Sequence, residues 1–139
     1  MISTGGSRKA THWPKCSILW SEFVDKLKIP VRSSETMQEY LSAGKARQAE
    51  LKDVGGFVGG TFKNDRRKAV YVEGRDLITL DLDNIPAGGA EDILKRVSGL
   101  GCAAVVYSTR KHTGYAPMLR VIIPLDETAA PDEYERAAR

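Results

Sequence analysis

The sequence predicts an α+β fold whose carboxyl-terminal half forms a split βαβ sheet. Residues 77–84 alternate between polar and apolar side chains with period two, which is typical of a half-buried strand. Residues 91–97 have acids in their first turn, bases in their last and an apolar stripe, which indicates a helix. Two strand-like runs, 103–109 and 118–123, and a helix from Pro131 follow. The order strand, helix, strand, strand, helix is the ferredoxin-like pattern without its last strand, so we expect a fragment of a longer protein.

The composition indicates a single soluble domain and excludes several classes of protein. Apolar residues make up 42% and charged residues 28% of the 139 residues, which are ordinary values. No apolar run is long enough to span a bilayer and no signal-peptide pattern is present, so we expect a cytoplasmic protein with no membrane partner. Cys16 and Cys102 lack zinc-ligand spacing and are expected to be reduced. A net charge of +3 permits nucleic-acid contact through a local basic surface.

Residues 1–76 are expected to form an amino-terminal α/β part. Residues 1–16 are polar and basic, and they form either a mobile arm or a first edge strand. Ser21 is a candidate N-cap for a short helix over 22–28, which Ile29 and Pro30 close.

A capping-box pattern at 36–39 predicts a helix to about Lys52 that Gly44 breaks or kinks. The glycine-rich segment 54–62 suggests a strand with a close approach by backbone or ligand. The next two segments are interpreted as a basic turn and a return strand: 63–68 and 69–72.

The strand at 77–84 is the element around which we expect the sheet to be built. It should be central, with the 118–123 strand, which Pro124 ends, beside it. The run at 103–109 is apolar on both faces, which also predicts a central strand. One face of the 77–84 strand is aliphatic and should pack against a helix, and the other face carries polar groups: Leu77, Thr79, Asp81 and Asp83.

Asp81 and Asp83 are the first candidate functional residues. They lie on neighbouring same-side positions, roughly 7 Å apart from the rise of a strand. Two carboxylates at that separation reach one hard divalent cation, or two cations that share a substrate phosphate. Asp is depleted in strands and like charges repel, so a bare surface strand gains nothing from the pair. The alternative is that Asp83 only begins a polar turn.

The segment from Ser108 to Arg120 is the second candidate. It offers a hydroxyl, an imidazole and several cations, which are the donors needed to hold a nucleoside triphosphate: Ser108, Arg110, Lys111, His112 and Arg120. With metal-bound phosphates beside the two Asp, the set suits in-line attack of a hydroxyl on an α-phosphate. The alternative is an ordinary basic hairpin loop. The predicted topology allows this loop and the end of the 77–84 strand to lie close together.

The combined motifs resemble the archaeo-eukaryotic primase superfamily. The resemblance is carried by a hydrophobic strand ending in Asp-x-Asp, a Ser-x-x-x-His loop and a Pro-x-x-Arg strand ending in Pro-Leu: residues 78–83, 107–113 and 117–125. More narrowly, the chain resembles the primase-polymerase domain of phage and prophage replication proteins, often fused to a helicase of the virulence-associated-protein-E type. Residues 7–8, 34–36 and 52–60 also resemble that family, so the similarity covers nearly the whole chain.

The resemblance implies specific roles. Asp81 and Asp83 would be catalytic carboxylates that bind Mg²⁺ or Mn²⁺, and Ser108 and His112 would contact the incoming nucleotide. Arg110, Lys111 and Arg120 are further candidates for phosphate or template contact, which completes the candidate site. Residues 1–139 would be a single, partial primase-polymerase domain, with 77–139 as its incomplete RRM-like catalytic part.

The chain departs from the family pattern in two ways. Classical primases have Ser-x-His where this chain has Ser-x-x-x-His. Ser108 therefore lacks the family's spacing from the histidine, and its implied role is less well supported than that of His112. Their third acidic motif has no counterpart here and is expected beyond the carboxyl terminus.

The predicted function is metal-dependent nucleotidyl transfer from nucleoside triphosphates on a single-stranded DNA template, with a downstream helicase domain as a further partner. Two alternatives stay open. The first is a non-catalytic RRM-like nucleic-acid-binding module, although such modules stack bases on sheet aromatics and this strand offers Thr and Asp. The second is a metal-dependent nuclease that uses the same two carboxylates.

Overall fold

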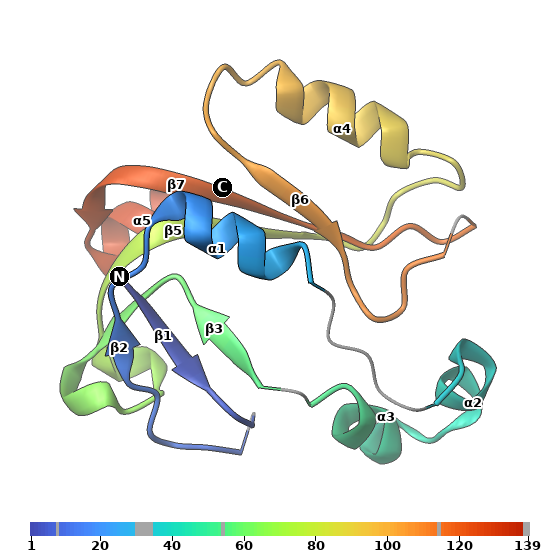
Figure 1. The fold of residues 1–139 in the computed structure, drawn as a ribbon, viewed down its shortest axis with the longest axis horizontal. Helices are drawn as coiled ribbons and strands as arrows, with labels where there is room; N and C mark the ends of the chain where they lie inside the picture. Colours follow the sequence, from blue (N-terminus) through green and yellow to red (C-terminus); the bar gives the residue numbers. More distant parts are fainter. Residues whose placement is uncertain (8, 30–34, 54, 114, 138–139) are drawn as a thin grey trace.

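The computed structural model describes residues 1–7, 9–29, 35–53, 55–113 and 115–137. This part of the chain holds two antiparallel sheets and five α-helices, so the predicted α+β class is confirmed. Figure 1 shows a small amino-terminal sheet against one end of a larger, longer-stranded sheet. Among the described residues, no helix has the length and apolar character needed to cross a membrane.

The small sheet has the strand order β2–β1–β3, with β1 at Ile2–Gly5, β2 at Lys15–Cys16 and β3 at Gly56–Val58. β1 is therefore the central strand of this sheet, and the prediction of an arm or an edge strand was wrong. Its position follows from burial, because Ile2 and Ser3 are both buried. The Ser3 hydroxyl donates to the carbonyl of Gly60 over 2.8 Å, which ties the small sheet to the large one.

The large sheet has the order β4–β5–β7–β6, with bounds Gly60–Phe62 (β4), Val72–Leu82 (β5), Leu119–Ala129 (β7) and Val105–Ser108 (β6). β5 is central and pairs antiparallel with β7, as predicted. β6 is at the edge, so the prediction of a central strand at 103–109 was wrong. Its apolar pattern has another cause, since Val105 packs against the core that the amino-terminal elements share.

β5 and β7 are longer than predicted. Residues 69–71 form a short 3₁₀ turn instead of a return strand, and β5 begins directly after it at Val72. Pro124 does not end β7, which continues to Ala129. Pro124 pairs with Leu77, next to the point where the register between β5 and β7 shifts. Proline is tolerated in a sheet at such a bulge, because a regular ladder hydrogen bond is already missing there.

The helices follow the predicted pattern with small shifts. The capping box is confirmed, since the Thr36 hydroxyl accepts the Glu39 backbone N–H, and the predicted break near Gly44 divides this region into two helices. The first helix of the chain begins at Trp20 with Leu19 as N-cap, so Ser21 lies inside it. The bounds are Trp20–Leu27 (α1), Met37–Ser42 (α2), Lys45–Leu51 (α3), Ala90–Ser98 (α4) and Pro131–Ala137 (α5).

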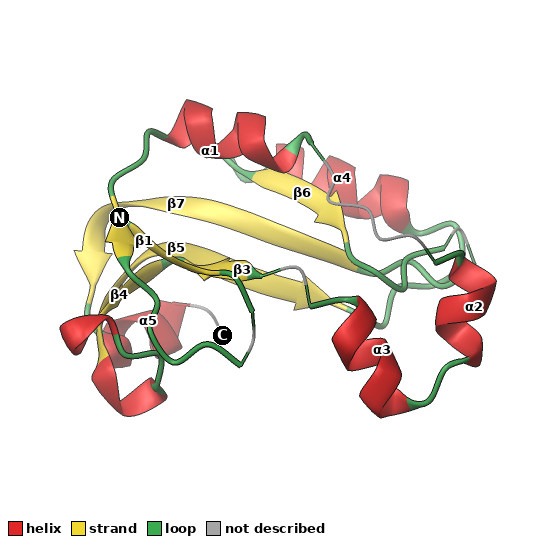
Figure 2. Cartoon of the chain, turned by 60° about the horizontal axis from the view of Figure 1, so that its bottom comes forward, coloured by secondary structure: helices red, strands yellow, loops and turns green. Residues whose placement is uncertain are grey.

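The core lies between α1, β1 and the large sheet. Phe23 of α1, Ile2, Leu77 of β5 and Ile122 of β7 form one buried cluster. Figure 2 shows α1 and α5 on opposite sides of the large sheet, with α2 and α3 together at one end. α5 contacts β5 and β7, and its Tyr134 hydroxyl accepts the backbone N–H of Thr79 over 3.2 Å.

Gly59 is the single residue between β3 and β4, and hence between the two sheets. Its carbonyl accepts the backbone N–H groups of Asp76 and Leu77. A Cβ atom at this position would lie 2.6 Å from the Leu77 Cβ. Gly59 lies in the glycine-rich segment that was predicted to permit a close approach. The backbone of β5 and its Leu77 side chain make that approach, so a larger residue does not fit at this position.

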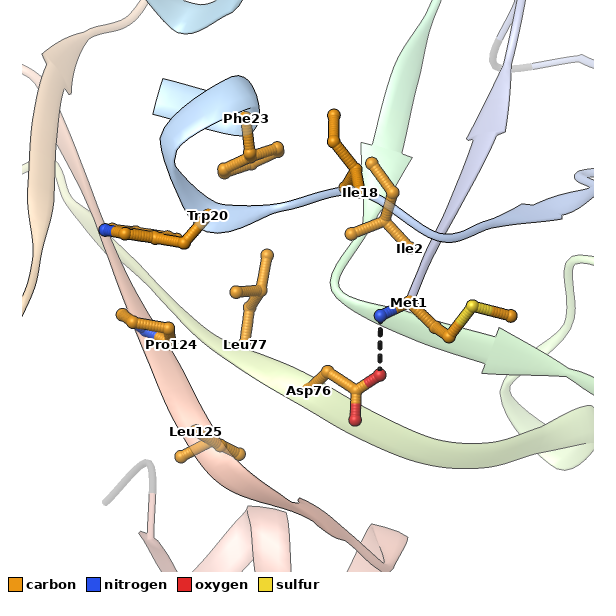
Figure 3. Close-up of a pocket in the computed structure, with 9 residues that line it drawn as sticks. All are labelled: Met1, Ile2, Ile18, Trp20, Phe23, Asp76, Leu77, Pro124 and Leu125. Atoms are coloured by element: carbon orange, nitrogen blue, oxygen red, sulfur yellow. Dashed lines mark ion pairs between the residues drawn. The ribbon is translucent and has the colours of Figure 1, made fainter. Parts of the chain in front are cut away.

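The seam between the sheets contains a hollow of about 210 Å³. Figure 3 shows Trp20 and Phe23 above it, with Leu77 and Pro124 below. Asp76 is the ionisable side chain of its lining, and its carboxylate binds the amino-terminal NH₃⁺ over 3.0 Å. The Thr128 hydroxyl donates to the same carboxylate. Because its apolar lining belongs to or borders the core and its carboxylate is engaged, we interpret this hollow as a packing seam.

Candidate functional site

Asp81 lies near the end of β5 in a row of polar side chains that crosses three strands. Asp81 pairs with Arg120 of β7, and Arg120 pairs with Tyr107 of β6. The Arg120 Nε donates to the Asp81 Oδ1 over 2.6 Å, and its Nη1 donates to the Tyr107 hydroxyl over 3.4 Å. Two of the predicted site residues, Asp81 and Arg120, are therefore in direct contact.

The electrostatics of this row favour a charged arginine. Burial alone would lower the pKa of Arg120, but the hydrogen bonds that it donates to Asp81 and Tyr107 raise its pKa above the ordinary value. Arg120 is thus a permanent cation next to a carboxylate whose side chain is 51% exposed. The Arg120 guanidinium therefore supplies the positive charge beside the Asp81 carboxylate.

Asp83 and Asn84 follow β5 and line a surface hollow of about 450 Å³ together with Asp81. Asp92 and Arg96 of α4 form its other side and pair with each other over 3.1 Å. Asp81, Asp83 and Asn84 offer hard oxygen ligands of the type that Mg²⁺ and Mn²⁺ prefer. The described residues contain no group of three or more acidic, His or Cys side chains with metal-binding geometry. A cation held by these oxygens would take its remaining ligands from water or phosphate.

His112 lies in the loop between β6 and β7, in a defined orientation. The backbone N–H of Met118 donates to its Nδ1 over 3.1 Å. A neutral imidazole that accepts at Nδ1 carries its proton on Nε2, which is then a donor. Backbone bonds from Thr109 to Met118 and from His112 to Thr109 close the loop. The loop thus fixes the imidazole and leaves Nε2–H as the atom that can donate to a ligand.

Ser108 is placed differently from Asp81. It pairs with Leu119, which in turn pairs with Leu82. Directly paired residues point to the same face and successive residues alternate, so this row lies on the opposite face of the sheet from the Asp81 row. Lys111 is exposed in the loop after β6. Asp81 therefore contacts Arg120 and shares a surface hollow with Asp83. Ser108 lies on the other face of the sheet.

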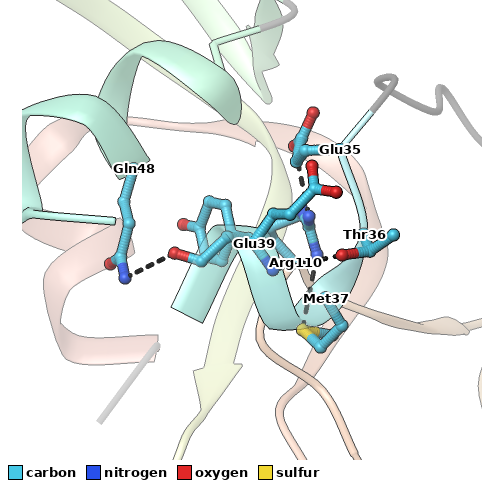
Figure 4. A network of polar contacts seen from close by, with 7 residues as sticks. Glu35, Thr36, Met37, Glu39, Gln48 and Arg110 are labelled. Carbon is cyan, nitrogen blue, oxygen red and sulfur yellow. Dashed lines mark hydrogen bonds and ion pairs between the residues drawn. The ribbon is translucent and has the colours of Figure 1, made fainter. Parts of the chain in front are cut away.

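Arg110 is held by residues from the α2 region (Figure 4). Its guanidinium bonds to the Glu35 carboxylate over 3.1 Å and to the Met37 sulfur over 3.5 Å. It also lies 4.1 Å from the centre of the Tyr40 ring, which is 1% exposed. The Gln48 side chain donates to the Tyr40 carbonyl and so joins α3 to this cluster. A phosphate at Arg110 would have to compete with these contacts.

Three residues with structural roles at the site were missed from the sequence: Tyr107, Glu35 and Tyr40. Tyr107 precedes the predicted Ser108, and its alternation with Val106 on β6 places it opposite Arg120 once the register is known. Glu35 and Tyr40 are separated from Arg110 by 75 and 70 positions in the chain. No local pattern in the sequence signals such a contact.

Comparison with known proteins gives one result. The family model described as the VapE N-terminal domain matches residues 1–139. No curated protein and no solved structure shows a significant match.

Proposed function

The chain belongs to the VapE N-terminal domain family, and from this premise we propose that it carries the nucleotidyl-transfer site of a VapE-type replication protein. The observation that carries the proposal is the shared hollow of Asp81 and Asp83 at the end of the central strand. Two carboxylates on one strand end, with an arginine in contact and a histidine donor in the neighbouring loop, are the groups that binding of a metal-nucleotide complex needs.

Each residue has a distinct task in this proposal. Asp81 and Asp83 hold Mg²⁺ or Mn²⁺ through one carboxylate oxygen or more each. When bound, the ion supplies charge stabilisation to the entering and leaving oxygens around an α-phosphate. The Nε2–H of His112 donates to a phosphate oxygen, and Lys111 adds positive charge from the same loop. Single-stranded DNA serves as the template.

Metal and nucleotide binding is the direct test. We would titrate Mn²⁺ into the ¹⁵N-labelled protein, with and without a deoxynucleoside triphosphate, and follow line broadening. Broadening should centre on residues 80–84 and increase with nucleotide. Asp83→Asn should lower the affinity for Mn²⁺ at least tenfold. Asp126→Asn is the matched control, because Asp126 is an exposed carboxylate near the other end of β7. Equal loss in both variants, or broadening elsewhere, contradicts the proposal.

The chemistry is tested by the products formed from labelled DNA with Mg²⁺ or Mn²⁺. Extension that requires a nucleoside triphosphate and is lost in Asp83→Asn supports nucleotidyl transfer. Degradation without nucleotide would assign the same carboxylates to a nuclease. DNA binding that needs neither metal nor Asp83, with no reaction in the full-length protein, would favour a non-catalytic module.

A further inference from the structure

A second feature of the molecule lies away from the carboxylates. Segments 9–15 and 63–68 together form what we call the basic patch, whose exposed basic side chains are Lys9, His12, Lys15, Lys63, Arg66, Arg67 and Lys68. The two segments contain six Lys or Arg and one carboxylate, that of Asp65. Their formal charge of +5 exceeds the +3 of the whole chain, so the remainder of the protein is net negative. The excess of positive over negative charge in the chain therefore lies in these two segments.

The fold brings these two segments together although 47 residues separate them in the sequence. The backbone N–H of Arg67 donates to the Thr11 carbonyl over 2.9 Å, and that of Trp13 donates to the Asp65 carbonyl over 2.7 Å. A bridge between His12 and Arg66 lies between these bonds. The juxtaposition is thus fixed by main-chain hydrogen bonds, and it does not depend on the flexible ends of the lysines.

The two arginines of the patch are supported by aromatic rings. The Arg67 guanidinium lies 4.4 Å from the centre of the Trp13 ring, and Arg66 lies 5.3 Å from that of Tyr71. Trp13 is 3% exposed, so its ring is a buried support. Stacking of this kind restricts the guanidinium and lowers the entropy lost when it binds an anion.

The patch is distinct from the candidate site. The 63–68 segment is followed by a short 3₁₀ turn and then by the start of β5 at Val72, whereas Asp81 lies at the far end of that strand. Nine residues of strand separate the two ends, which is about 30 Å. A ligand the size of one nucleotide cannot contact both.

We propose that the basic patch binds the phosphate backbone of a nucleic acid without reading its bases. Six Lys or Arg outnumber the two carboxylates beside them, that of Asp65 and that of Glu73, which pairs with Lys15 over 4.0 Å, and this excess of positive charge matches a polyanion. Trp13 is buried and leaves no face for base stacking, which argues against recognition of bases. Specific protein interfaces have an apolar centre. Val70 is the one large apolar side chain among the described residues that is exposed beside the patch. A single such side chain is too little for that centre, which argues against a protein partner. This inference is independent of the proposed nucleotidyl transfer.

The test measures binding of fluorescein-labelled duplex DNA by anisotropy in EDTA, over 50 to 300 mM salt. The variant Lys63→Gln/Lys68→Gln removes two exposed charges that make no side-chain hydrogen bond or ion pair with the described residues. Each phosphate contact contributes about 0.9 to the slope of log K against log salt. We expect the slope to fall by about 1.8, and the affinity to fall about 60-fold at 0.1 M salt. Lys26→Gln/Lys28→Gln, at the carboxyl-terminal end of α1, is the control: it removes the same number of exposed charges, of which Lys28 pairs with Asp25, and should change both quantities little.

Several outcomes would overturn the inference. One is an equal loss in the α1 control, and another is an unchanged salt slope in the patch variant. If polyglutamate displaces the duplex as well as unlabelled DNA does, the patch is a surface for acidic proteins. Binding that disappears in Asp81→Asn/Asp83→Asn would belong to the candidate site. Retained binding in that variant, with loss of Mn²⁺ affinity, separates the two proposals.

Discussion

The contact between Arg120 and Asp81 gives the sharpest prediction about the candidate site. If Asp81 binds a divalent cation, the cation competes with the Arg120 guanidinium, whose Nε lies 2.6 Å from the Asp81 Oδ1. Replacing the arginine by glutamine removes this competitor and a nearby positive charge. We therefore predict that Arg120→Gln binds Mn²⁺ more tightly than the unaltered protein in the absence of nucleotide.

The magnitude follows from the exposure of the pair. The side chains of Arg120 and Asp81 are 35% and 51% exposed, so water screens their attraction strongly. Ion pairs in that setting contribute about 1 kcal/mol at most. Release of that energy corresponds to about a fivefold gain in Mn²⁺ affinity. With a nucleoside triphosphate present the sign should reverse, because the variant has lost a cation that can bind phosphate.

The assay is the same Mn²⁺ titration, run with and without nucleotide on Arg120→Gln and on Arg47→Gln. Arg47 is the control because it pairs with Glu50 on an exposed face of α3. Thermal unfolding should change little in Arg120→Gln, since the half-exposed Asp81 carboxylate regains water. Weaker Mn²⁺ binding without nucleotide would refute the reasoning, and would mean that Arg120 supports the carboxylate in its metal-binding position.

Two predictions concern stability. Glu35→Gln removes the charge that holds Arg110, and the Glu35 side chain is only 6% exposed. We therefore expect the free energy of unfolding, measured with urea, to fall by about 1.5–3 kcal/mol. Hydrogen exchange at residues 109–113 should become faster. An unchanged midpoint would show that the Tyr40 ring and the Met37 sulfur hold the arginine without the charge of Glu35. Gly59→Ala places a Cβ atom 2.6 Å from that of Leu77 and should cost about 1–3 kcal/mol, whereas Gly6→Ala, with open space around it, should be close to neutral; equal effects on the unfolding midpoint would contradict this account.

Alternation of side chains was sufficient to locate the central strand and its two carboxylates. The alternation at 77–84 is kept in β5, but the β5 residue in the buried core cluster is Leu77, which lies on the face shared with Thr79 and Asp81. The helices at 37–51 and 90–98 were likewise predictable, since their caps and end charges are local signals. Local signals were not sufficient everywhere, since the predicted N-cap Ser21 lies inside α1 and residues 69–71 form a 3₁₀ turn.

Features that depend on a distant partner could not be predicted. Pro124 has the signature of a strand end, and only the bulge against β5 explains why the strand continues. The apolar pattern at 103–109 does not distinguish a central strand from an edge strand covered by other elements. The Asp81–Arg120 contact and the opposite orientation of Ser108 follow from the register between strands, which no single segment encodes.

The one-residue joint at Gly59 has a mechanical consequence. Consecutive Cα atoms are about 3.8 Å apart, so β3 cannot shift far without pulling β4 with it, and β4 is bonded to β5. β1 is bonded to β3 in turn. A force applied to the amino-terminal sheet is therefore transmitted to the strand that carries Asp81, and the two sheets behave as one stiff frame. The α2–α3 pair contacts the loop after β6 through Arg110, whose guanidinium lies over the Tyr40 ring and pairs with Glu35.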